Sequence, residues 1–597
     1  MSKAKWCAAL FALAAGAHTY AARAADDAAP EPVDFQWGVK IPLRDGVKLN
    51  ATLYRPQGQK DALPCVFTLT PYISQSYHDR GMYFAANGYV YLTVDVRGRG
   101  NSDGEFTPLL QEARDGHDIV EWLATQPFCN GKTSMWGGSY AGYNQWATAK
   151  EFPAHLTSIV PVASPMPGVD YPMRNNIFYP YDMMWLTFVS GRASQDKIFG
   201  DRLFWATKFR AGYESYAPFA TLDTRVGNPS THFQTWISHP AQDAYWDSFN
   251  PTPEQYAKLN LPILTITGHY DGDQPGAFAF YDAHMKYGNA AAKAQHYLVI
   301  GPWDHAGTRT PKEEVDGVKF GPASLVDMNA MHKAWYDWTL KGGAKPEFLK
   351  QRVAYYVAGE EAWRYAPTLE AITARKQPYY VSSNGNAATD VYASGALTTD
   401  KAAARAGKSR YVYDPLDVSS ADADTTDSGG KDLIDQRSLL ARNGKQIVFH
   451  TAPFEKDTEV SGFFSFKGWI SLDQPDTDIG IDVYAIDDTG GSLFLTGDLM
   501  RTRYRGGLRE AKLSTPGKVE EYTFDRFTFV SRLLKKGTRL RVVIHPINSL
   551  YSEKNFNSGG VVTQETRKDA RAVTVTLHHD GGKPSALYVP IGKASKE

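Results

Sequence analysis

Short apolar, β-branched runs alternate with glycine-bearing loops and a helical stretch in the first part of this chain, and this alternation most constrains its fold. Strands are predicted over residues 48–54, 64–69, 89–94 and 133–136, with a helix over 110–126. Such βαβ alternation is typical of a mostly parallel sheet covered on both faces. The pattern resumes at 158–162, stops, and returns at 262–267 and 297–300, which indicates an insertion.

The remaining sequence divides around this core. The insertion, residues 167–259, is rich in aromatic side chains and predicts a helical cap over the carboxyl edge of the sheet, where α/β folds bind ligands. After about residue 363 alternating strands, such as 479–486 and 540–544, indicate an antiparallel jelly-roll sandwich. Long surface loops are expected over 383–430. The expected parts are therefore a core of residues 30–166 and 260–362, a cap of 167–259 and a sandwich of 363–597.

Composition and charge argue against nucleic acid as a partner. The 597 residues are 43% hydrophobic and 22% charged, as in an ordinary globular protein, and their number favours two or three domains. The formal net charge is −1, and no basic stripe is present, which argues against nucleic-acid binding. The sequence leaves the oligomeric state open, a homo-oligomer included.

The N-terminus has the pattern of an export signal. Lys3 and Lys5 precede an apolar stretch, residues 6–16, and Ala22-Arg23-Ala24 supplies a cleavage site. We therefore expect residues 1–24 to be a signal peptide and the protein to be periplasmic or secreted. The apolar stretch is too short to span a bilayer, so no membrane anchor is expected.

Outside this segment the only cysteines are Cys65 and Cys129. An oxidising compartment would permit a disulfide, but both residues lie beside predicted central strands, which favours two free, buried thiols. Their pairing is left open. Neither has a CxxC or Cys/His neighbourhood, and we expect no metal and no organic cofactor.

The strongest chemical motif is the run from Ser134 to Tyr143, in which a predicted strand meets Gly137-Gly138-Ser139 and continues as a helix. This is the pattern of a nucleophile elbow, a sharp strand-to-helix turn that exposes a serine. Ala141 stands where a glycine is usual, but alanine is nearly as small. The motif predicts Ser139 as the nucleophile of a serine hydrolase.

Candidate partners follow two later strands in the order acid, then histidine. Asp271 comes directly after the strand at 262–267, and it would orient the histidine and stabilise its imidazolium form. Asp273 is the competing acid. His305 follows the strand at 297–300 and would take the Ser139 proton and return it to the leaving group.

An oxyanion needs two hydrogen-bond donors. The backbone N–H of Tyr140, the residue after the nucleophile, is expected to supply one. The phenol of Tyr72, at the end of an early strand, is a candidate for the second donor, although a buried core tyrosine would give the same sequence pattern.

These motifs together resemble a known family. Gly-x-Ser-Tyr-x-Gly, Thr70-Pro71-Tyr72, the run from Asp95 to Gly104, Tyr270-Asp271-Gly272 and Gly-Pro-Trp-x-His are similar to those of the cocaine esterase, α-amino acid ester hydrolase and X-Pro dipeptidyl-peptidase group of serine hydrolases. The resemblance runs from about residue 37 to the C-terminus. It implies an α/β-hydrolase core, a helical cap and a C-terminal jelly roll, and it implies that Tyr72 is an oxyanion donor.

Substrate choice is less constrained. In this group, amino acid ester hydrolases hold a substrate ammonium with a carboxylate cluster, to which Asp273 would correspond. The next residue is Gln274, and the segment around Arg174-Asn175-Asn176 offers no acidic counterpart. We therefore expect a hydrolase of small esters or amides, including amino acid esters and β-lactam-type acyl groups. The alternatives are an X-Pro dipeptidyl-peptidase acting on short peptides and a non-catalytic binding protein.

Overall fold

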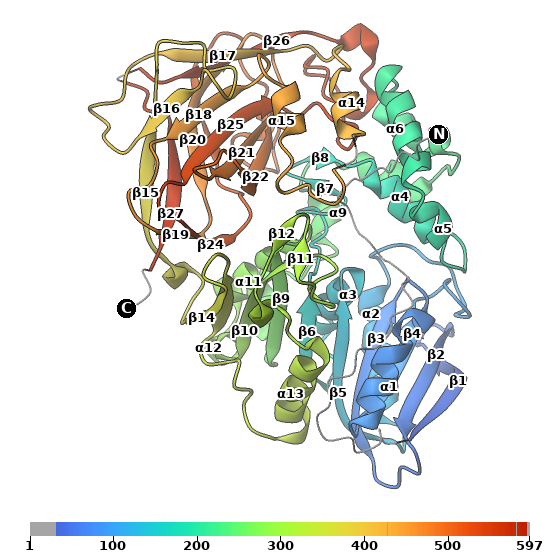
Figure 1. Cartoon of the computed structure of the whole chain (residues 1–597). Coiled ribbons are helices and arrows are strands. Elements are labelled where there is room, and N and C mark those ends of the chain that lie inside the picture. The colour runs from blue at the N-terminus through green and yellow to red at the C-terminus, as the bar shows by residue number, and fades with distance from the viewer. Residues whose placement is uncertain (1–31, 427, 581, 594–597) are drawn as a thin grey trace, which may run out of the picture.

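The protein is described here from a computed structural model, which covers residues 32–426, 428–580 and 582–593 (Figure 1). The predicted signal peptide, residues 1–24, lies outside the described residues. Within the described ranges, no helix combines the length and apolar character needed to cross a bilayer.

A ten-stranded sheet forms the core, and its strands run parallel from β4 to β13. The outer pairs β1–β2, β2–β4 and β13–β14 are antiparallel. In spatial order the strands are β1 (Val33–Pro42), β2 (Lys48–Pro56), β4 (Val90–Asp95), β3 (Leu63–Thr70), β5 (Cys129–Gly138), β6 (Leu156–Val162), β9 (Ile263–Tyr270), β10 (His296–Asp304), β13 (Val353–Val357) and β14 (Ala362–Ala366).

Helices cover both faces of this sheet, as βαβ alternation predicts. Helices α1 (His78–Ala86) and α13 (Met328–Lys341) pack on one face, where Trp335 joins Trp136 of β5 in one apolar cluster. Helices α2 (Glu112–Ala124), α3 (Tyr140–Ala149) and α11 (Gln274–Tyr287) cover the other, where Trp146 stacks on Phe280. Helix α12 (Ala290–Ala294) leads into β10, and the hairpin β11 (Glu314–Val315) and β12 (Val318–Lys319) follows it.

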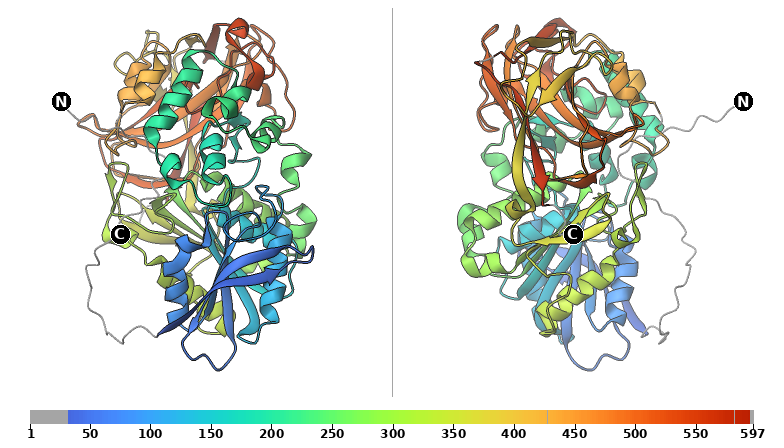
Figure 2. Two further views of the ribbon diagram at one scale, coloured as in Figure 1. Left: turned by 90° about the vertical axis from the view of Figure 1, so that its right-hand side faces the viewer. Right: turned by 60° about the vertical axis from the view of Figure 1, so that its left-hand side comes forward.

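The inserted cap consists of short helices and one small hairpin, as expected from its aromatic content. Asn175 and Asn176 both have positive φ in the turn between β7 (Met173–Arg174) and β8 (Ile177–Phe178), as type I′ hairpin turns require. The helices are α4 (Tyr181–Phe188), α5 (Asp196–Phe199), α6 (Arg202–Glu214), α7 (Leu222–Val226), α8 (Thr231–Ile237), α9 (Ala244–Asp247) and α10 (Pro253–Lys258). Figures 1 and 2 show α4 to α6 beside the C-terminal part of the chain.

The C-terminal part is a thirteen-stranded β structure with its own apolar core, which agrees with the predicted sandwich. Its pairings are antiparallel except for that between β16 and β18. The strands are β15 (Thr373–Ser382), β16 (Gly395–Thr398), β17 (Lys408–Tyr413), β18 (Ile447–Thr451), β19 (Thr458–Gly462), β20 (Ser465–Leu472), β21 (Asp478–Ile486), β22 (Ser492–Arg501), β23 (Glu520–Phe524), β24 (Val530–Leu534), β25 (Arg539–Pro546), β26 (Val573–His578) and β27 (Ala586–Gly592).

Two details of this part differ from expectation. The core sheet continues through β14, so the expected boundary at residue 363 falls inside a core strand. Residues 383–430 are not only loop, because they contain β16, β17 and the short helix α14 (Ser420–Asp424); helix α15 (Arg437–Ala441) follows. Strand β17 alternates strictly between exposed and buried residues, a pattern that the polar composition around it obscures.

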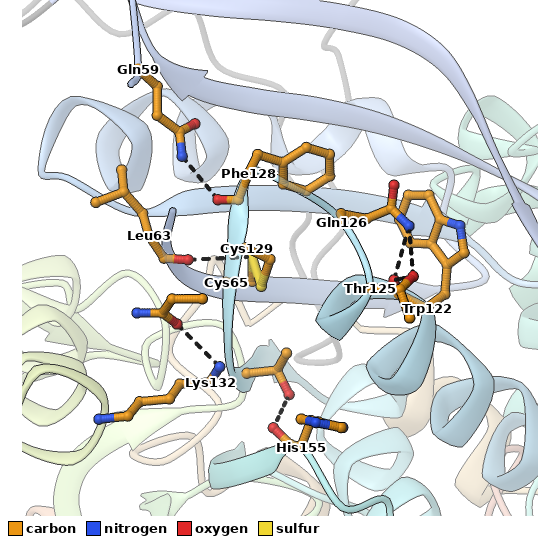
Figure 3. Close-up of a disulfide and its surroundings, with 12 residues drawn as sticks. Gln59, Leu63, Cys65, Trp122, Thr125, Gln126, Phe128, Cys129, Lys132 and His155 are labelled. Carbon is orange, nitrogen blue, oxygen red and sulfur yellow. Dashed lines mark hydrogen bonds between the residues drawn. A yellow bond between two sulfur atoms is a disulfide. The ribbon is translucent and has the colours of Figure 1, made fainter. Parts of the chain in front are cut away.

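Cys65 and Cys129 form a disulfide, so the preference for free thiols was wrong (Figure 3). Cys65 lies near the start of β3 and Cys129 at the start of β5, and their Cα atoms are 5.9 Å apart. The chain visits β4 between these strands, but in the sheet β3 lies directly beside β5. The sequence order of the strands does not reveal this adjacency.

Candidate active site

Ser139 lies at a sharp turn between β5 and α3. Its φ of 61° and ψ of −130° are unusual for a residue other than glycine, and its N–H donates to the carbonyls of Val162 and Ala163 at 3.0 and 3.1 Å. Ala141 is accommodated because its methyl group packs where Gly137 has no side chain: a Cβ on Gly137 would lie 2.5 Å from the Ala141 Cβ. The alanine at position 141, where a glycine is usual, is therefore compensated by the glycine at position 137.

Asp271 and His305 follow neighbouring parallel strands, β9 and β10, and their side chains meet. His305 Nδ1 is 2.7 Å from Asp271 Oδ1, and both side chains are buried. Thr267 Oγ1 donates to Asp271 Oδ2 at 2.8 Å, and the Asp273 amide donates to Oδ1 at 3.0 Å. Asp271 is thus held in a position to orient the imidazole.

Asp273, the competing acid, lies farther from the histidine, with 3.7 Å between Asp273 Oδ2 and His305 Nδ1. Burial lowers the pKa of His305, and the nearby charge of Arg309 lowers it further, whereas Asp271 raises it. A lowered pKa keeps the imidazole neutral, and so able to accept a proton, at mildly acidic pH.

Tyr72 and Ser139 line the same cavity. Trp185 Nε1 donates to the Tyr72 phenol oxygen at 3.1 Å. Burial raises the pKa of Tyr72, so the phenol keeps its proton and can donate it. The Tyr140 amide belongs to the first turn of α3, whose N–H groups have no acceptor within the helix.

The Tyr140 side chain has a different task from its amide. Its hydroxyl donates to the buried Glu112 and accepts from the Leu109 amide at 2.6 Å, and its ring stacks on Trp185. These contacts fix the first turn of α3, and with it the direction in which the amide points.

A cavity of about 320 Å³ opens over Ser139. The core contributes Ser139, Tyr72, Gly272 and Asp273, while the cap contributes a mostly aromatic wall. The cap residues that line it are Asp170, Tyr171, Arg174, Tyr179, Tyr181, Met184, Trp185, Arg202, Trp205, Ala206 and Phe209. Such a pocket suits an apolar or aromatic group with a few polar anchors.

Asp170 is a pocket carboxylate that the sequence reasoning missed. Its oxygens accept hydrogen bonds from the amides of Met166 and Gly276 at 2.8 and 2.5 Å, which ties the start of the cap to the first turn of α11. Burial raises the pKa of Asp170 to about 8, and burial together with Asp170 and Asp271 raises that of Asp273 well above its ordinary value. A second acid was sought only near residues 174–176, and Asp170 lies shortly before them in the sequence. The only sequence signal for Asp170 is its position at the start of the insertion.

Gln274 follows Asp273 and does not face the substrate cavity. It is fully buried, and its side-chain amide joins two parts of the molecule: Nε2 donates to the Gly268 carbonyl at 2.8 Å, and Oε1 accepts from the Phe529 amide at 2.6 Å. The residue that replaces an expected carboxylate therefore docks the sandwich onto the loop that carries Asp271.

A second cavity, of about 470 Å³, lies between the core and the sandwich and includes neither Ser139 nor Tyr72 in its wall. It shares Arg174 and Gly272 with the first cavity. The smaller cavity is the candidate active site because it contains Ser139, the predicted nucleophile. Among the described residues, no group of three or more His, Cys, Asp or Glu side chains is arranged to hold a metal ion.

Comparisons with known proteins agree with this architecture. Residues 45–307 match the X-Pro dipeptidyl-peptidase (S15) family, and residues 346–588 match the X-Pro dipeptidyl-peptidase C-terminal non-catalytic domain. The cocaine esterase of Rhodococcus sp. (strain MB1 Bresler) is 26% identical over 577 residues, which cover 93% of this chain and 98% of that protein.

Solved structures are similar over almost the whole chain. An α-amino acid ester hydrolase and an aminopeptidase from a marine sediment Thaumarchaeota archaeon each give a TM-score of 0.79 at 21% identity, with 96% of this chain and 98% of the other covered. The likeness in fold thus extends over core, cap and sandwich together.

Proposed function

Because the chain belongs to the X-Pro dipeptidyl-peptidase S15 family of serine hydrolases, we propose that it cleaves small esters or amides through an acyl-enzyme on Ser139. The observation that carries this proposal is the arrangement at the carboxyl ends of the strands. The His305–Asp271 pair, 2.7 Å apart, follows β9 and β10, and Ser139 with Tyr72 follows β5 and β3 in the same sheet.

The proposed reaction uses the same groups in both half-reactions. His305 takes the Ser139 proton as Oγ attacks the carbonyl carbon, and the Tyr140 amide and Tyr72 phenol donate to the oxyanion. His305 then gives the proton to the leaving oxygen or nitrogen while Asp271 stabilises its charged form. In the second half-reaction His305 deprotonates a water that attacks the acyl carbon, and it then returns the proton to Ser139 Oγ as the acid product leaves.

For the acyl part we propose an aromatic or apolar group that carries an amine. The aromatic wall of the cap supports the first property. The buried acids Asp170 and Asp273 support the second, because a substrate ammonium beside them would favour the ionised forms that burial disfavours. The competing candidate is an X-Pro dipeptidyl-peptidase, which the family of residues 45–307 favours. It would also need an anchor for a substrate ammonium.

Labelling by a fluorophosphonate probe tests the nucleophile. Wild type should be labelled and Ser139→Ala should not, whereas Ser215→Ala, at an exposed serine of the cap, should be labelled like wild type. Equal labelling of wild type and Ser139→Ala would refute the proposal. A non-catalytic binding protein would leave all three unlabelled.

Steady-state assays separate the two substrate classes. We expect turnover of α-amino acid esters and simple acyl esters and little turnover of X-Pro anilides. Efficient release of X-Pro dipeptides would establish the peptidase instead.

We also propose that the mature protein acts in the periplasm or outside the cell. The basic and apolar pattern of residues 1–24 supports export, and a disulfide between Cys65 and Cys129 suits an oxidising compartment. Fractionation of cells that express the full chain, followed by N-terminal sequencing, tests this: cytoplasmic protein that retains residues 1–24 would contradict it.

A further inference from the structure

The loop after β10 places an arginine beside the histidine of the site. Thr308 N–H donates to the Asp304 carbonyl at 3.1 Å and Thr310 N–H to the Ala306 carbonyl at 3.0 Å, so residues 304–310 form a helical turn. His305 and Arg309 are four residues apart on this turn. Side chains at this spacing lie on the same side of a helical turn.

Arg309 also packs against the nucleophile elbow. A Cβ on Gly138 would lie 2.5 Å from Arg309 Nη1 and 2.7 Å from its Cδ. Gly138 is not among the glycines with positive φ, so its backbone conformation does not demand glycine. The second glycine of Gly137-Gly138-Ser139 instead leaves the space that the Arg309 side chain occupies. One side chain thus spans the residue before Ser139 and the turn that carries His305.

Several contacts hold this arginine in place. Arg80 Nη2 donates to the Arg309 carbonyl at 3.0 Å, and Arg309 Nη1 donates to Thr308 Oγ1 at 3.3 Å. Thr308 Oγ1 in turn donates to the His305 carbonyl at 2.7 Å. No carboxylate forms an ion pair with Arg309 in the described parts of the chain, so its charge is not neutralised by a direct partner.

The charges around His305 come from three directions. Asp271 and Asp273, on the loop after β9, approach its Nδ1 at 2.7 and 3.7 Å, and Asp304 precedes it on β10. Arg309 is the cation on its own turn, and after burial it is the main influence that lowers the pKa of His305. Asp271 and Asp304 favour the imidazolium form, whereas Arg309 opposes it.

We propose that Arg309 is a positioning residue that ties the histidine turn to the nucleophile elbow and, through its charge, keeps His305 unprotonated between turnovers. The inference rests on the proposed role of His305 as the base. While Ser139 transfers its proton to His305 and onward to the leaving group, the nearby positive charge favours the second transfer, because it makes the imidazolium a stronger acid.

The test is the pH dependence of kcat/KM for a simple acyl ester that has no amine. In Arg309→Met, the midpoint of the acid limb should move upward by roughly half a unit to one unit, since removal of a neighbouring cation raises the pKa of the base. At the wild-type midpoint, kcat/KM expressed as a fraction of each enzyme's own alkaline plateau should be about two- to fivefold lower in Arg309→Met than in wild type. Arg309→Lys keeps the charge and should keep the wild-type midpoint. Arg375→Met, at an exposed arginine of β15, is the matched control.

The outcomes separate this inference from the proposed function. Equal midpoints in wild type and Arg309→Met, or equal shifts in Arg309→Met and Arg309→Lys, would overturn the role of the charge. Thermal unfolding of each variant identifies those that fail to fold. If Arg309→Met fails to fold, the plateau rate of Arg309→Lys is compared with that of wild type. If the fluorophosphonate probe does not label wild type, the assignment of Ser139 as the nucleophile is refuted instead.

Discussion

Two carboxylates near His305 are placed differently, and we expect them to have different tasks. Asp271 is held by Thr267 and by the Asp273 amide with its Oδ1 2.7 Å from the imidazole, while the Asp273 side chain faces the cavity at 3.7 Å from it. We expect Asp271→Asn to lower kcat by about 10³- to 10⁴-fold for every substrate, because the histidine loses its orienting anion.

We expect Asp273→Asn to raise KM for α-amino acid esters by about tenfold, with little change for the matched ester that lacks the amine. The measurement is kcat and KM for both esters in both variants. A similar loss of kcat in the two variants would show that the two acids act as one unit.

Tyr72 offers a second test at the scale of a single group. Tyr72→Phe removes the phenol but keeps the ring that stacks on Phe188. Since the phenol is proposed to donate only to the developing oxyanion, kcat should fall by about 10²- to 10³-fold with KM nearly unchanged. A rise in KM without a fall in kcat would place the phenol in substrate binding instead.

At this scale the sequence predicted what depends on chain order. Ser139, Asp271 and His305 were found because each follows a predicted strand, and parallel strands bring their carboxyl ends to one edge. That they form a working triad stays a prediction. Asp170 was missed because its approach to Asp273 depends on how the cap folds back over the core, which local pattern does not encode.

At the scale of elements, strand positions were predicted well and strand neighbours were not. Seven of the ten core strands, β2 to β6, β9 and β10, lie within a few residues of the runs that predicted them, because buried strands are short and apolar. The strands at the two edges of the sheet, β1, β13 and β14, were not predicted. The adjacency of β3 and β5, and with it the disulfide, depends on the order of strands across the sheet. Strand order is set by packing of helices and loops far apart in the sequence.

The disulfide should stabilise the core substantially. It closes a loop with a sequence separation of 64 residues, for which loop-closure entropy gives about 4 kcal/mol. We expect the double variant Cys65→Ser, Cys129→Ser to lose much of this stabilisation, measured as the free energy of unfolding in denaturant. Reductant should lower the unfolding midpoint of wild type to that of the variant and leave the variant unchanged. Two titratable thiols in unreduced, unfolded mature protein would contradict the pairing.

At the scale of the whole molecule, a buried ionic cluster joins the cap to the sandwich. Arg501 of β22 donates to Asp478 at 3.0 Å and to Glu553 at 2.9 Å, and its Nη1 donates to the Asn176 carbonyl of the cap hairpin at 3.0 Å. The Glu553 amide donates to the Phe178 carbonyl at 2.9 Å. The β7–β8 hairpin, whose Arg174 lines the cavity over Ser139, is thereby fixed to the sandwich.

We expect Arg501→Met to destabilise the protein by about 3–5 kcal/mol, because two carboxylates remain buried without their cation. Arg509→Met is the matched control: it also removes a cap–sandwich ion pair, with Asp247, but the two side chains are 60% and 53% exposed. Its loss should be below about 1 kcal/mol. Thermal and denaturant unfolding measure both, and equal losses would show that burial does not decide the strength of this junction.

Gln274 has a further consequence for how such a protein can acquire a new specificity. A carboxylate at this position would lose the hydrogen bonds that the amide nitrogen now donates to the core, and it would bring a buried charge to the junction with the Phe529 amide. An acid gained here would weaken the docking of the sandwich and would still lie outside the wall of the cavity over Ser139. A new carboxylate anchor would therefore have to arise at one of the positions that line this cavity.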